Sequence, residues 1–303
     1  ATMNKITQFL GISLLSLLAL PAFASLNIFA TVPEWGALAK EIGGDKVSIY
    51  TATTALQDPH RIEAKPSLLA QARRAQLVIA TGAELEIGWL PLVIRDSGNS
   101  AIQSGRPGYF EAASQITMRE VPQVLDRANG DVHAGGNPHL HLDPRNILKV
   151  GEALTARMSE IDATNAEIYR ANFKTFAGKW QAAMLRWEKE AAPLRGLPVL
   201  VHHNSFVYLA AWLGLKEQGT LEPKPGVEPS SGHLSALLER QKSAPARIVL
   251  RTAYQSAGPS LWLAEKAGIP AVLLAFTVGG TAEAGNLFGL FDDTIQRLLK
   301  ATR

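Results

Sequence analysis

Seven histidines are the side chains in this 303-residue chain best suited to chemistry, and their placement is more informative than their number. His60 lies in a loop just after Asp58, His139 lies in a polar segment, and His203 ends an apolar run. The chain has no cysteine, so a metal site would use imidazole and carboxylate groups. Such ligands suit zinc, manganese or ferrous iron better than cuprous copper.

The spacing of neighbouring histidines helps to decide which of them could bind the same ion. His202 and His203 are adjacent, so in an extended segment they point to opposite sides and at most one meets a given ion. His139 and His141 are two residues apart and could face the same way. We expect His133, which lies in a glycine-bearing stretch, to be a surface residue or a weak metal lure rather than a fixed ligand.

Alternating strands and helices are expected to position these residues. Helical stretches separate the strand-like ones, which favours parallel sheets covered on both faces. In such sheets ligands collect beyond the carboxyl ends of the strands. The strand-like stretches are residues 26–32, 47–51, 76–80, 198–202, 246–250 and 270–274.

A long helical segment divides the chain. Residues 144–192 are nearly free of Gly and Pro and carry apolar residues at helical spacing. We therefore predict an α/β protein of two lobes, each a mostly parallel sheet with helices on both faces, joined by one long rigid helix. The expected boundaries are an N-terminal lobe at 25–160, a linking helix at 161–193 and a C-terminal lobe at 194–303.

The first 24 residues are typical of a signal peptide. The apolar run from Phe9 to Leu20 is shorter than the roughly 20 residues that span a bilayer, and it leads to a small-x-small pattern ending at Ala24. We predict export to the periplasm with cleavage after Ala24. With no cysteine to carry a lipid, we expect no direct membrane anchor.

Several segments, in this order along the chain, resemble the zinc- and manganese-type (cluster A-I) periplasmic solute-binding proteins of metal ABC importers, the zinc-uptake receptors in particular. The resemblance covers essentially the whole mature chain. It implies two lobes around a buried metal, His60, His139 and His203 as ligands, a membrane permease as partner, and a monomer. The segments that carry it are Asp58-Pro59-His60, 82–90, 137–144, 203–208 and 225–230.

The sequence lacks the fourth ligand that the resemblance would imply. Its carboxylate would fall near Phe276, where none stands. Water, His141 or a loop carboxylate such as Glu228 remain as alternatives. Three neutral imidazoles suit zinc and manganese prefers more oxygen, so zinc is expected as the transported ion, with manganese second.

Other functional classes have less support. His60 with Glu63, and His139 with His141 and Asp143, resemble short motifs of zinc hydrolases, but Pro144 stands where a further histidine would be expected. A metal chaperone or adhesin of the same fold is a further alternative. The formal charge of +3 comes with scattered basic residues, which gives no support to a nucleic-acid surface. We expect a binding protein and no enzyme.

Overall fold

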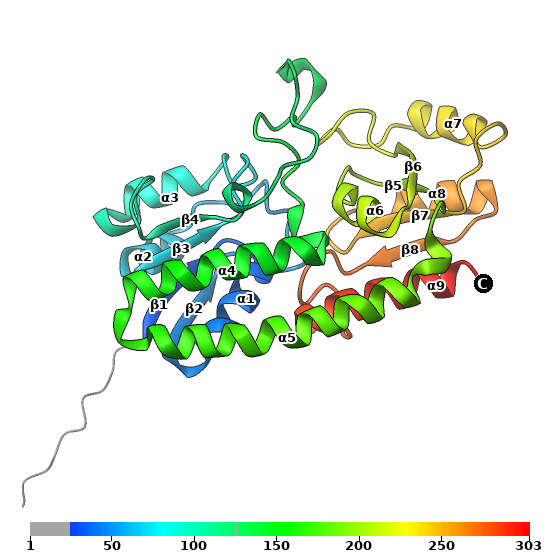
Figure 1. Ribbon diagram of the computed structural model, residues 1–303. Coiled ribbons are helices and arrows are strands. Elements are labelled where there is room, and N and C mark those ends of the chain that lie inside the picture. The colour runs from blue at the N-terminus through cyan, green and yellow to red at the C-terminus, as the bar shows by residue number, and fades with distance from the viewer. Residues whose placement is uncertain (1–24, 125) are drawn as a thin grey trace, which may run out of the picture.

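The computed structural model describes residues 25–124 and 126–303 (Figure 1). The predicted signal peptide, residues 1–24, lies outside the described residues. Within those two ranges, no helix combines the length and the apolar character needed to cross a membrane.

The first lobe is built on a parallel sheet of four strands, in the order β2-β1-β3-β4. Alternate side chains of β1 enter two different apolar clusters: Ile28 and Ala30 join one, and Phe29 joins the other. Because successive side chains of a strand point to opposite faces, the sheet is buried on both sides. The strands are β1 (Leu26–Ala30), β2 (Val47–Thr51), β3 (Leu77–Ala80) and β4 (Tyr109–Glu111).

The second lobe repeats this arrangement, with the order β6-β5-β7-β8 and parallel pairing throughout. On β5, Val199 and Val201 pack into the large cluster shared with the first lobe, whereas Leu200 packs into a cluster of its own lobe. The strands are β5 (Pro198–Val201), β6 (Lys216–Thr220), β7 (Ile248–Thr252) and β8 (Ala271–Leu274).

Helices cover the sheets and connect the lobes (Figure 1). The longest, α5, packs against α1 and α4 at one end and α9 at the other, so it runs along both lobes. The predicted fold class is confirmed. The helices are α1 (Pro33–Gly43), α2 (Pro66–Arg74), α3 (Leu90–Ser97), α4 (Pro144–Ile161), α5 (Ala166–Glu190), α6 (Val207–Leu213), α7 (Ser231–Arg240), α8 (Ala257–Ala267) and α9 (Leu287–Ala301).

Aromatic side chains fix α5 against its neighbours. Trp180 is fully buried, its ring contacts Trp187 and Phe291, and its indole N–H donates to the Pro144 carbonyl oxygen at 2.8 Å. A single side chain of α5 thus binds the start of α4 and packs on α9. These contacts make the connection between the lobes rigid.

Replacement of Trp180 by Ala should remove this connection. We expect Trp180→Ala to lower the free energy of unfolding by about 3–5 kcal/mol, because it leaves a large cavity and removes a buried hydrogen bond. Urea denaturation followed by circular dichroism measures the change. Lys174→Ala, an exposed position on the same helix, is the control and should change stability by less than about 0.5 kcal/mol. Equal midpoints for the two variants would contradict the role given to Trp180.

Candidate metal site

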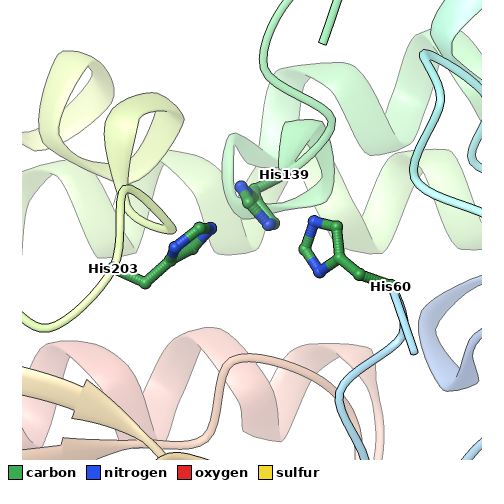
Figure 2. Close-up of side chains that lie close together, drawn as sticks. All are labelled: His60, His139 and His203. Carbon is green, nitrogen blue, oxygen red and sulfur yellow. The ribbon is translucent and has the colours of Figure 1, made fainter. Parts of the chain in front are cut away.

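Three histidines from distant parts of the chain meet between the lobes. His60 lies in the loop after β2, His139 lies just before α4, and His203 follows β5. One ring nitrogen from each lies within 4.8 Å of the other two. Figure 2 shows the three rings pointing toward one another. His139 and His203 are buried and His60 is half-buried, so the point where they meet is largely shielded from solvent.

Carboxylates orient two of these rings. His60 Nδ1 lies 2.8 Å from Asp58 Oδ1, and His203 Nδ1 lies 2.6 Å from Glu222 Oε2. Since a carboxylate only accepts, Nδ1 carries the proton in both rings and Nε2 keeps its lone pair. Burial raises the pKa of Asp58, but the hydrogen bonds from the His60 ring and backbone N–H help to hold that pKa below its usual value. Asp58 is therefore an anion at neutral pH.

An amide orients the third ring. Asn137 Oδ1 accepts hydrogen bonds from the His139 backbone N–H at 3.0 Å and from Nδ1 at 2.9 Å. Burial, reinforced by the neighbouring histidines, lowers the pKa of His139 well below the value of a free imidazole. His139 is thus neutral, and its Nε2, like that of His60, is buried without a hydrogen-bond partner.

The same local motif positions two of the three histidines. In both Asp58-Pro59-His60 and Asn137-Pro138-His139, the side-chain oxygen two residues earlier binds the histidine's backbone N–H and its ring. This orienting role was not predicted from the sequence, although the repeated Asx-Pro-His pattern could have indicated it. Glu222, which lies nineteen residues after His203 and carries no local signal, was not predicted either.

His141 points away from the three-histidine cluster. Its Nε2 donates to the Phe276 carbonyl oxygen at 2.7 Å, and its Nδ1 lies 3.2 Å from Glu34 Oε1. The Phe276 ring packs against both His139 and His141, with centroids 5.4 and 4.9 Å apart. An apolar ring therefore occupies the side of His139 where the family resemblance led us to look for a carboxylate.

Two other histidines lie close by. The His133 ring stacks on His60 with centroids 5.4 Å apart and is half-buried. His202 is 3% exposed. Neither ring contributes to the cluster of three within the described residues. Glu228 is exposed and lines a cavity of about 260 Å³ that also reaches His60 and His203.

The two hydrolase-like motifs do not assemble into a catalytic site. Glu63 is exposed. Asp143 caps α4 through the Arg145 backbone N–H at 2.9 Å and binds the Arg145 guanidinium at 2.7 Å. Neither carboxylate joins the three histidines, so neither is placed to activate water on an ion held there.

A network behind Asn137 reaches the second lobe. Glu120 Oε2 accepts from Asn137 Nδ2 at 3.1 Å and from Asn204 Nδ2 at 2.7 Å. The nearby Glu217 on β6 has a buried Oε1 with no partner. Burial, reinforced by the charge of Glu120, raises the pKa of Glu217 to about 7.

This raised pKa predicts a pH-dependent gain from Glu217→Gln. The folded chain holds the Glu217 proton up to about pH 7, whereas the unfolded chain releases it near pH 4.5. The buried carboxyl therefore lowers the free energy of unfolding as the pH rises from about 4.5 to about 7, and the full cost remains above pH 7. Below about pH 4.5 the cost is absent. We expect the melting temperature of metal-free Glu217→Gln to exceed that of the parent at pH 8 and to match it near pH 4. The exposed Glu63→Gln controls for the lost charge; a gain that is equal at both pH values would contradict the assignment.

Comparison with known proteins identifies the family. Residues 28–301 match the family model described as ZnuA, zinc-uptake complex component A, periplasmic. A metal ABC transporter substrate-binding lipoprotein, ScbA of Streptococcus cristatus, is 25% identical over 192 residues, which are 59% of each chain. The high-affinity zinc uptake system protein ZnuA of Bacillus subtilis is 24% identical over 229 residues, 74% of this chain and 70% of that protein.

Other relatives are named for a different metal, and solved structures share the fold. Proteins of Streptococcus gordonii and Streptococcus pneumoniae are manganese ABC transporter substrate-binding lipoproteins by name. A crystal structure of ZnuA superposes with a TM-score of 0.76 at 22% identity, covering 92% of this chain and all of that one. The chain thus belongs to the ZnuA family of metal-binding, solute-binding proteins of ABC importers.

Proposed function

We propose that this protein binds a zinc ion through the Nε2 atoms of His60, His139 and His203 and delivers it to the membrane permease of an ABC importer. The observation that carries the proposal is the convergence of three imidazoles whose Nδ1 atoms are each bound to an oxygen. Every ring is thereby held in the tautomer that offers Nε2 to a metal. The family is one of binding proteins, so no enzymatic step is assigned.

The spacing of the nitrogens supports zinc. A tetrahedral zinc ion with Zn–N bonds of roughly 2.0–2.1 Å places its ligand nitrogens about 3.4 Å apart. The three ring nitrogens, within 4.8 Å of one another, need only a small inward movement to reach that spacing. The cluster is all nitrogen, whereas manganese prefers oxygen ligands. Relatives carry either metal in their names, so the choice rests on this ligand set.

We propose water as the fourth ligand. His141 is bound to Phe276 and faces Glu34, and the Phe276 ring closes that side. On the other side, cavities of about 220 and 260 Å³ adjoin the histidines, which is ample room for water. Glu228 lines the larger cavity but is exposed, so holding it on the ion would cost side-chain entropy.

Delivery would use the two-lobed architecture. His60 and His139 come from the first lobe and His203 from the second, so relative movement of the lobes changes the ligand set. A permease that binds the separated lobes more tightly than the closed ones would thereby lower zinc affinity. We propose that this takes place in the periplasm, after removal of residues 1–24, with the protein acting as a monomer.

The ligand assignment predicts a ranking of variants. Loss of a residue that only orients a ligand typically weakens metal binding by about 10–100-fold. We expect a larger loss of zinc affinity in His60→Ala, His139→Ala and His203→Ala, because each removes a bond to the ion. His202→Ala is the matched control, since His202 is adjacent to His203 yet lies outside the cluster, and should change affinity by less than about tenfold. Competition titration against a chromogenic chelator measures all four; a His202 variant as weak as the others would refute the assignment.

Metal preference gives a separate prediction. Protein freed of metal and then offered equal zinc and manganese should retain zinc, because the all-nitrogen cluster disfavours the harder ion. Inductively coupled plasma mass spectrometry of the desalted protein gives the ratio directly. Equal or greater manganese content would overturn the choice of zinc while leaving the histidine site intact.

A further inference from the structure

Two surface loops from different lobes meet beside the histidine cluster. Figure 1 shows the loop that precedes α4 reaching toward the segment before α7. Residues of both loops line the two cavities that adjoin the histidines. We call this contact the clasp; its residues are Ala128, Gly130 and Asp131 on one side and Lys224, Pro225 and Gly226 on the other.

The clasp is held by hydrogen bonds near solvent. The Asp131 N–H donates to the Pro225 carbonyl oxygen at 2.9 Å, and Lys224 Nζ donates to the Ala128 carbonyl oxygen at 2.7 Å. Asp131 and Lys224 are both exposed. Water can replace such bonds when they break, so opening them costs little.

Glu222 connects the clasp to the metal site. One oxygen of its carboxylate, Oε2, accepts both from His203 Nδ1 at 2.6 Å and from the Gly226 N–H at 2.9 Å. The Glu222 side chain is 13% exposed. A metal-binding histidine and the backbone of the clasp therefore share a single acceptor atom.

On the opposite side of the histidine cluster, buried hydrogen bonds join the two lobes. Glu34 Oε2 accepts from Thr277 Oγ1 at 2.6 Å, and His141 Nε2 donates to the Phe276 carbonyl oxygen at 2.7 Å. Glu34 and His141 are 2% and 1% exposed. Separating these buried groups would leave them unsatisfied away from water, so this side is the costly one to open.

We propose that the clasp is the gate through which the ion enters and leaves, and that Glu222 is the positioning residue that couples this gate to His203. Opening the clasp moves Gly226 and with it the carboxylate that orients His203, so the ion loses support from one ligand as its exit opens. This inference rests on the proposed function.

A reversible cross-link tests the gate. A β-carbon at Gly226 would lie 3.4 Å from that of Asp131, close to the roughly 3.5–4.5 Å of a disulfide, and the chain has no cysteine to interfere. The pair Asp131→Cys with Gly226→Cys is loaded with zinc, oxidised, and mixed with a chromogenic chelator. Zinc transfer should slow by about tenfold or more when oxidised and recover on reduction.

Three results would count against the gate. Equal transfer rates in the oxidised and reduced protein overturn it. A parent protein that binds no zinc overturns both the gate and the proposed function. Because Gly226 has a φ of +77° that strains a cysteine, Lys224→Ala is a second variant: it removes the bond to the Ala128 carbonyl oxygen without backbone strain and should speed zinc release. If the disulfide does not form and Lys224→Ala releases zinc at the parental rate, the clasp is not the gate.

Substitution of Glu222 tests the coupling. Glu222→Ala should speed zinc release by about tenfold or more, since His203 and Gly226 both lose their acceptor. Glu222→Gln keeps an acceptor oxygen and should recover part of the slow release, whereas a merely structural role would show as a change in melting temperature without that recovery. Release from Glu222→Ala at the parental rate would overturn the coupling.

Discussion

Much of the structure holds three imidazole rings so that their lone pairs point at one place, in a shielded space between the two lobes. The Nε2 atoms of His60 and His139 are buried without a partner, which is unfavourable unless an ion satisfies them. The rings stay in this orientation because Nδ1 on the far side of each is bound. Asp58 and Asn137 do this from two residues away, within rigid Asx-Pro-His turns.

The third histidine imposes a different requirement, because His203 belongs to the other lobe. Its position depends on the placement of whole elements, which the packing of α5 against α4 and α9 determines. The buried contacts of Glu34 with Thr277 and of His141 with Phe276 hold one side of the interface. Movement between the lobes is therefore least costly on the side that carries Glu222 and the exposed loops.

The sequence predicted the parts of this arrangement that depend on short-range patterns. Apolar runs bounded by turns located the strands, and alternation with helices predicted parallel sheets. His141 could share a face with His139 only if residues 139–141 were extended. Residues Leu140–Leu142 instead form a 3₁₀ turn, so His139 and His141 do not share a face. No local sequence pattern indicates Glu222, because Glu222 meets His203 only once β6 and the chain around it have folded.

The proposed site has no fourth protein ligand, and Phe276 stands where one would be expected. Phe276 adopts a φ of +63°, an unfavourable conformation for a side chain of this size, and its carbonyl is held there by His141. Its ring supplies a neutral wall beside His139. On the proposed ligand set, three neutral imidazoles would leave a bound dication with both its charges. Asp58 and Glu222, each hydrogen-bonded to one of these rings, would lie one imidazole away from it and would balance it electrostatically without bonding to it. Such an ion would keep the proposed open position toward the cavities, which suits a protein that must release what it binds.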